Sequence, residues 1–164
     1  MLGTTIWLIV QGILFFYAQI LVVPALGLGN LIPNILLPWL VYNLWKKPFT
    51  IVVPVSFFIA LMHDMTSPLL FGMHALIFML ICIGIDLFRI PFEHTSAVAR
   101  VLAIVLCNIF YVLFSALVHG LVSGFAPEAS ITYLLIFLVN IAFSFAIFWS
   151  MEFLSRLKIV VSDE

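Results

Sequence analysis

The chain has 164 residues, of which 66% are hydrophobic and 8% are charged, and its formal net charge at pH 7 is −1. A soluble domain has about 25% charged residues, so a chain of this size and composition cannot hide its apolar surface in a water-soluble core. The net charge also gives no indication of nucleic-acid binding, which needs a basic surface. The composition therefore predicts an integral membrane protein.

Six apolar stretches follow one another along the sequence, and each is a candidate for a membrane-spanning helix, which needs roughly 20 apolar residues. We predict helices at residues 3–23, 29–45, 49–63, 67–88, 98–123 and 131–154. The second and third stretches are short for a full crossing. The expected fold is an all-α integral membrane protein with six transmembrane helices in a single domain that covers residues 1–164.

The basic residues indicate how the six predicted helices are oriented across the membrane. All six of them fall in three clusters, namely Lys46 with Lys47, Arg89 with Arg100, and Arg156 with Lys158. Two apolar stretches separate each cluster from the next, so all clusters return to one face if each stretch crosses the membrane. Cytoplasmic loops are enriched in Lys and Arg. We therefore expect the basic clusters and both termini on the cytoplasmic side.

Two alternative topologies are less favourable. A re-entrant hairpin formed by the second and third stretches would bury Lys46 and Lys47, and a Lys at the bilayer centre costs roughly 2.5–3.5 kcal/mol. Cleavage of the first stretch as a signal peptide requires a positively charged n-region, but residues 1–5 contain no Lys or Arg. We expect the first helix to be retained.

Polar side chains within the membrane are candidate functional groups. On this topology His63, Asp64, His119 and Glu128 lie at the outer face, and His74 lies two turns into the fourth helix. Histidine and carboxylate are competent zinc ligands, but no HExxH motif or histidine pair at a spacing of four is present. We predict interfacial capping and hydrogen bonds between helices, with a metal-dependent membrane enzyme as the competing interpretation.

Several polar residues have specific structural predictions. Asp64 precedes the start of the fourth helix, so its carboxylate can accept hydrogen bonds from the free N–H groups of that helix's first turn. Asn108 and Asn140 each lie near mid-helix, and we expect them to bond each other. Glu152 precedes Arg156 by four residues, a favourable spacing for an ion pair on one helix.

A stripe of small residues lies on the fifth helix at Ala116, Gly120 and Gly124, with spacings of four. Small residues at this spacing let transmembrane helices approach closely, either within the bundle or with a partner. No serine has the GxSxG context of a nucleophile, and Asp64 and Asp86 are expected at opposite faces. We predict no catalytic residue, no cofactor-binding residue and no metal ligand, and thus no enzyme.

Two stretches resemble the rod shape-determining protein MreD family. The first is Pro33-Asn34 with the apolar run that follows it. The second, residues 59–76, contains an apolar helix end, Asp64, a short Ser-containing turn and Gly72. The match covers about a third of the chain, and the chain length and the helix count also fit.

The resemblance implies a protein of the bacterial inner membrane that belongs to the cell-elongation (rod-shape) complex and has no known reaction. It implies a fold similar to that of the substrate-binding subunits of energy-coupling-factor transporters. It also implies a non-catalytic scaffold that binds a bitopic MreC-like partner. Through this partner it would connect to peptidoglycan synthases and the actin-like cytoskeleton, supporting peptidoglycan synthesis and cell shape.

By this resemblance Pro33, Asn34, Asp64 and Gly72 are structural or partner-contacting residues. No cofactor is expected. The alternative function is that of a substrate-binding subunit of an energy-coupling-factor vitamin transporter. Such subunits usually have an Ala-x-x-x-Ala motif on the first helix, where this chain has only Ala18.

Overall fold

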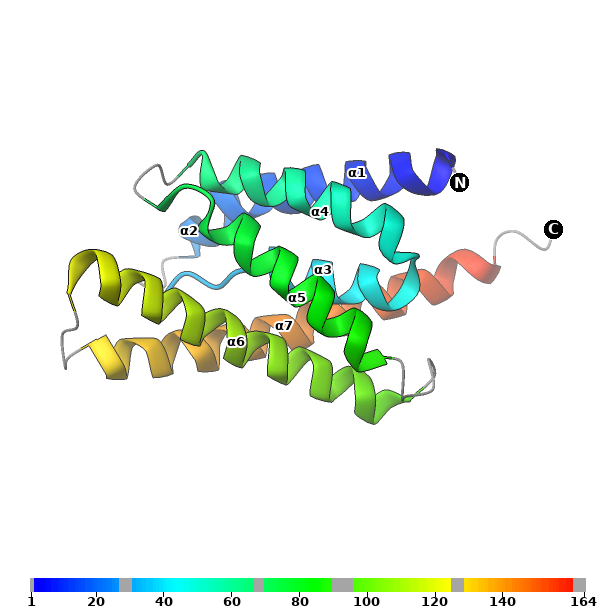
Figure 1. Cartoon of the computed structure of the whole chain (residues 1–164). Helices are drawn as coiled ribbons and strands as arrows, with labels where there is room; N and C mark the ends of the chain where they lie inside the picture. Colours follow the sequence, from blue (N-terminus) through cyan, green and yellow to red (C-terminus); the bar gives the residue numbers. More distant parts are fainter. Residues whose placement is uncertain (1, 27–30, 67–69, 90–95, 125–128, 161–164) are drawn as a thin grey trace.

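The computed structural model describes residues 2–26, 31–66, 70–89, 96–124 and 129–160, and it contains no strand in these ranges. Six helical segments form one bundle (Figure 1). The first is a continuous helix made of α1 (Leu2–Tyr17), η1 (Ala18–Val22) and α2 (Val23–Ala25). The others are α3 (Leu36–Lys46), α4 (Phe49–Asp64), α5 (Met73–Arg89), α6 (Ala97–Ser123) and α7 (Ala129–Val160).

Three of these helices are long and apolar enough to cross a membrane, namely Leu2–Ala25, Ala97–Val122 and Ile131–Arg156. Phe49–Asp64 and Met73–Leu87 are shorter apolar helices. The prediction of an all-helical fold is therefore confirmed. The helix predicted at 67–88 begins at Met73, although residues 67–69 lie outside the described ranges, and the last helix continues to Val160.

Helix α3 is the centre of the bundle. Every residue from Leu36 to Trp45 is buried, and α3 packs against α1, α4, α5, α6 and α7. A helix that is hydrophobic on all sides belongs in the interior. With 11 residues it extends about 16 Å at 1.5 Å per residue, so it is too short to cross a membrane by itself.

The predicted helix at residues 29–45 is therefore wrong in its first part, because residues 31–34 form an irregular segment and the helix begins at Leu36. Pro33 explains the late start, since a proline disfavours the helical conformation of the residue before it. Pro38 is compatible with α3 because it lies in the first turn, where the backbone N–H has no partner within the helix.

The first helix contains a widened turn at η1, where the N–H of Val23 bonds the carbonyl of Ala18. Pro24 follows immediately. In a regular α-helix the Pro24 ring would clash with the carbonyl of Ile20, four residues earlier. The wider turn relieves this crowding. Gln19 lies in this turn, and it is the buried residue of η1.

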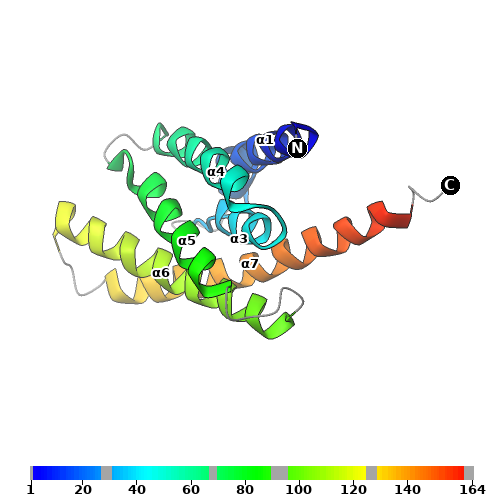
Figure 2. The same ribbon diagram turned by 45° about the vertical axis from the view of Figure 1, so that its right-hand side comes forward.

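The ends of the bundle differ in chemistry. The start of α1, the connection from α3 to α4 and the C-terminal part of α7 all lie at one end (Figure 1). We call this the basic end, because Lys46, Arg100 and Arg156 meet there around Glu152. We call the opposite end, with His63 and His74, the histidine end. Helices α6 and α7 are side by side near the histidine end and diverge towards the basic end (Figure 2).

Candidate functional site

Asp64 is the last residue of α4, is fully buried, and bonds the start of α5. Its Oδ1 accepts a hydrogen bond from the backbone N–H of His74 at 3.0 Å, and its Oδ2 accepts one from the N–H of Ala75 at 3.0 Å. First-turn N–H groups lack acceptors within their own helix, and the helix dipole favours a negative charge there. The prediction that Asp64 bonds the start of the next helix is confirmed.

The same carboxylate orients the imidazole of His74. Asp64 Oδ1 lies 2.8 Å from His74 Nδ1. Because an ionised carboxylate only accepts hydrogen bonds, Nδ1 donates the proton, and in the neutral imidazole Nε2 then has the lone pair. Nε2 lies 3.4 Å from the hydroxyl of Tyr111. His74 is only 8% exposed. The bond to Asp64 holds the ring in position and makes Nδ1 the donor.

His63 packs against this pair. Its ring centroid lies 4.3 Å from that of His74, with the rings at 66° to each other. His63 Nδ1 is buried and has no hydrogen-bond partner among the described residues. A ring nitrogen of His63, one of His74 and a carboxylate oxygen of Asp64 lie within 4.8 Å of one another. This spacing is compatible with a shared metal ion, whereas the sequence pattern alone had favoured capping.

His63 and His74 line a cavity of about 540 Å³ at the histidine end. The polar side chains on its wall are those of Gln19, Asn34, His63, His74, Tyr111, Ser115, His119 and Tyr133. The wall is therefore unusually polar for a chain with 66% hydrophobic residues. Glu128, which the sequence also placed at this end, lies outside the described residues.

A second polar cluster supports the irregular segment before α3. Gln19 Nε2 donates to the carbonyl of Pro33 at 3.0 Å, and Gln19 Oε1 accepts from the N–H of Ile35 at 2.7 Å. Irregular backbone within a membrane is tolerated only where its polar groups are satisfied inside the protein. The Gln19 side chain thus supplies two hydrogen bonds that the missing helical turn cannot.

Asn34 completes this support. Its Oδ1 accepts from the N–H groups of Leu36 and Leu37 at 3.0 and 3.3 Å, which caps α3. Its own N–H donates to Asn140 Oδ1 at 2.7 Å. Asn34 therefore links the centre of the bundle to α7.

The predicted bond between Asn108 and Asn140 is wrong. Asn108 Nδ2 instead donates to the carbonyl of Ile104 at 2.8 Å and to Ser144 Oγ at 3.1 Å. Asn140 lies one turn before Ser144 on α7, and its Oδ1 accepts from Asn34. Both asparagines do bond across helices, but each has a different partner, because hydropathy does not define how far one helix is shifted along another.

At the basic end, Glu152 is the acceptor for three cations. Its carboxylate lies 2.9 Å from Lys46 Nζ and 3.3 Å from Arg100 Nη1. The predicted pair with Arg156 is present at 3.7 Å, but that side chain is 70% exposed. Glu152 and Arg100 are buried. One residue from each of the three basic clusters therefore lies at the same end of the bundle, as expected; the side chains of Arg89 and Lys158 lie outside the described set.

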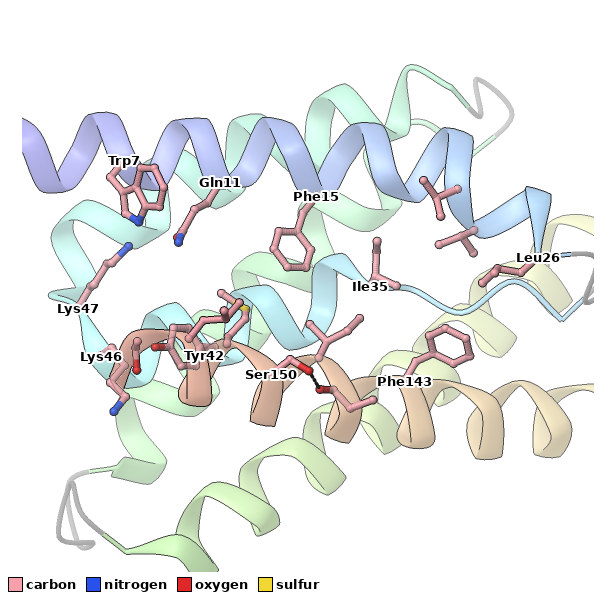
Figure 3. Close-up of a pocket in the computed structure, with 17 residues that line it drawn as sticks. Trp7, Gln11, Phe15, Leu26, Ile35, Tyr42, Lys46, Lys47, Phe143 and Ser150 are labelled. Atoms are coloured by element: carbon pink, nitrogen blue, oxygen red, sulfur yellow. Dashed lines mark hydrogen bonds between the residues drawn. The ribbon is translucent and has the colours of Figure 1, made fainter. Parts of the chain in front are cut away.

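A groove of about 1340 Å³ separates α1 from α7, and α3 forms its floor (Figure 3). Trp7, Gln11 and Phe15 project into it from α1, and Tyr42 and Ile35 come from the α3 side. Its remaining wall includes Phe143, Ala146, Ile147, Ser150, Met151 and Leu154 of α7. Lys46 and Lys47 line its basic end. The groove is thus mostly apolar with cations at one end.

The small residues of the sequence have different roles. Gly72 has φ +89° directly before α5, and Gly124 has φ +87° where α6 ends. Both conformations favour glycine over other residues, so Gly124 ends the helix and does not extend the stripe. Ala116 and Gly120 lie on α6, where Gly120 is buried, and their proposed role in close helix approach stays a prediction.

Sequence reasoning missed two residues that the structure makes important. Gln19 is a polar residue in an apolar run, five residues before Pro24. A polar side chain so close to a proline that interrupts a helix is a signal that the sequence does contain. Gly12 marks a close approach of helices. A Cβ atom there would lie 2.9 Å from Ile59 Cγ1 and 3.1 Å from Trp39 Cζ2. No spacing pattern in the sequence distinguishes Gly12 from the other glycines.

Comparison with known proteins found no matching family model, no matching curated protein and no matching solved structure. The resemblance to the MreD family stays a prediction, and function is inferred from the residues and their geometry.

Proposed function

We propose that this chain is a multi-pass protein of the bacterial inner membrane and a non-catalytic scaffold of the cell-elongation (rod-shape) complex. The apolar exterior supports membrane insertion. Large hydrophobic side chains are exposed on every long helix, for example Leu14 at 61%, Leu113 at 65% and Leu134 at 58%. Exposed apolar area of this extent indicates an interaction surface, and lipid chains would cover it.

The basic end is the cytoplasmic end in this proposal. Lys46, Arg100 and Arg156 gather there, and cytoplasmic segments are enriched in such residues. Single cysteines test the orientation in intact cells, because the native cysteines are buried. Met65→Cys, at a position that is 68% exposed near the histidine end, should react with an impermeant maleimide. Arg156→Cys should react only after the membrane is permeabilised, and the reverse pattern would invert the topology.

The groove between α1 and α7 is the observation that supports a partner-binding role. Its lining runs along the first helix from Trp7 to Leu26, about 28 Å at 1.5 Å per residue, which is close to the roughly 30 Å hydrocarbon thickness. A single transmembrane helix has this length. We propose that the helix of a bitopic MreC-like protein occupies the groove, with acidic residues beside it facing Lys46 and Lys47.

Photo-crosslinking tests this interface. A photoreactive amino acid replaces Phe15 on one wall of the groove or Phe143 on the other, in cells that also produce an MreC-like single-span protein. The control position is Leu113 on α6, which is 65% exposed and does not line the groove. Crosslinks to this partner from the two groove positions, and not from the control, are expected. Crosslinks absent from all positions, or equal at all three, would refute the assignment.

The polar cavity at the histidine end favours a second candidate, a substrate-binding subunit of a vitamin transporter. Its volume of about 540 Å³ lies within the roughly 300–1,000 Å³ of small-molecule sites. Titration of the purified protein with water-soluble vitamins separates the two functions. Tight binding of one vitamin would replace the scaffold proposal, whereas the scaffold predicts no binding.

A further inference from the structure

Three metal-ligating side chains meet at the histidine end although they come from two different helices. His63 and Asp64 end α4, and His74 is the second residue of α5. One potential ligand atom from each lies within 4.8 Å of the others. Zinc binds imidazole nitrogens at about 2.0–2.1 Å, so ligand atoms within 4.8 Å of one another are near the spacing that one shared ion requires.

His74 already has the hydrogen bond typical of a metal-bound histidine. Such histidines usually donate the ring N–H that does not bind the metal to a carboxylate, which fixes the ring and its tautomer. Asp64 accepts this bond from His74 Nδ1 at 2.8 Å, and it leaves the Nε2 lone pair available beside the Tyr111 hydroxyl. Asp64 also supplies a buried negative charge, which would offset the positive charge of a cation near the start of α5.

His63 provides an independent observation. Its Nδ1 is buried without a hydrogen-bond partner in the described part of the chain, and a buried polar atom without a partner costs free energy. Coordination of a metal ion would satisfy this nitrogen. The pair also borders a cavity of about 540 Å³, which has room for water molecules at the remaining coordination positions.

We propose that His63 and His74 bind one divalent transition-metal ion of the zinc class, with Asp64 holding His74 in position. The site does not depend on the scaffold function, because the groove between α1 and α7 shares no lining residue with this cavity. A failed metal test therefore leaves the partner interface untouched, and a failed crosslinking test leaves the metal site untouched.

The test uses the full chain in detergent after removal of any histidine tag and treatment with a chelator. Zinc is added, free metal is removed by gel filtration, and the metal content is measured by mass spectrometry. Binding is then followed by Co²⁺ absorption with Zn²⁺ competition. One Zn²⁺ per wild-type chain is expected, together with a Zn²⁺-dependent rise in Tm, because a ligand that binds only the folded state stabilises it.

Two matched variants define the ligands. His63→Phe keeps a ring packed on His74 but removes both nitrogens, and it should weaken Zn²⁺ binding at least about 100-fold. His119→Phe makes the same change at an exposed position on the same cavity outside the three-residue cluster, and it should bind like the wild type. A wild-type chain without bound Zn²⁺ and without the Tm rise would overturn the proposal, whatever the variants do. Equal binding by wild type and His63→Phe would also overturn it.

Discussion

Replacement of Gln19 by Leu tests whether one side chain holds the break before α3. Leucine has a similar size, so the loss of packing volume is small, but both hydrogen bonds to the irregular segment disappear. The carbonyl of Pro33 and the N–H of Ile35 would then be buried without these partners. Each such group costs about 1–3 kcal/mol, so the free energy of unfolding should fall by about 2–6 kcal/mol.

The chain offers a matched control in Gln11, two helical turns earlier on the same helix. Its side-chain oxygen has no hydrogen-bond partner among the described residues. Gln11→Leu removes a buried oxygen that has no such partner, so it should not lower the free energy of unfolding. Equilibrium unfolding in mixed detergent micelles, followed by circular dichroism, measures both variants. The reasoning is refuted if Gln19→Leu is as stable as Gln11→Leu.

Three further substitutions are measured in the same unfolding assay. Asp64→Ala should lower the free energy of unfolding by about 2–5 kcal/mol, because two N–H groups at the start of α5 lose their acceptor; an unchanged value would contradict the capping role. Glu152→Gln should cost about 3–5 kcal/mol because the buried Arg100 loses the negative charge of Glu152. Arg156→Ala, at an exposed side chain, should cost less than about 1 kcal/mol. Gly12→Val should cost about 1–3 kcal/mol through crowding of α1 against its neighbours, and Gly84→Ala, with no atom within 4 Å, should stabilise α5 by about 0.5–1 kcal/mol.

Hydropathy and charge were enough to predict the helices and the basic end. Apolar length depends on local sequence, so the bounds of α4 and α6 came within a residue or so of the predicted 49–63 and 98–123. The gathering of basic residues at one end followed from the number of predicted helices alone, because two helices separate each basic cluster from the next. The role of Asp64 was also predictable, because a carboxylate in the connection between two helices can accept hydrogen bonds from the free N–H groups of the second helix.

The contacts between distant helices were not predictable. Lys46 and Glu152 are separated by 106 residues, and nothing in the sequence indicates that α3 and α7 bring them together. The same problem affected Asn108, since a shift of one turn along α7 exchanges Asn140 for Ser144 as its neighbour. The late start of α3 was missed because an apolar run has the same hydropathy whether it is helical or irregular.

Some buried polar side chains of this bundle have an evident stabilising role, whereas His63 does not. Gln19, Asn34, Asp64 and Glu152 all bond backbone groups or cations that would otherwise be unsatisfied, so their stabilising roles explain their presence. His63 differs, because its buried Nδ1 lacks a partner among the residues described and the side chain lies beside two other potential metal ligands, Asp64 and His74. A polar group inside a membrane bundle without a structural partner is a functional candidate by default.

This difference has a measurable consequence in the metal-free protein. If Nδ1 of His63 is unsatisfied, His63→Phe removes a desolvation cost of about 1–3 kcal/mol while it keeps the ring contact with His74. The variant should then be more stable than the wild type without metal and less stable with saturating Zn²⁺. A variant less stable than the wild type under both conditions would show that His63 is a packing residue with a partner of its own, because only a ligand can reverse the order of stability between the two proteins.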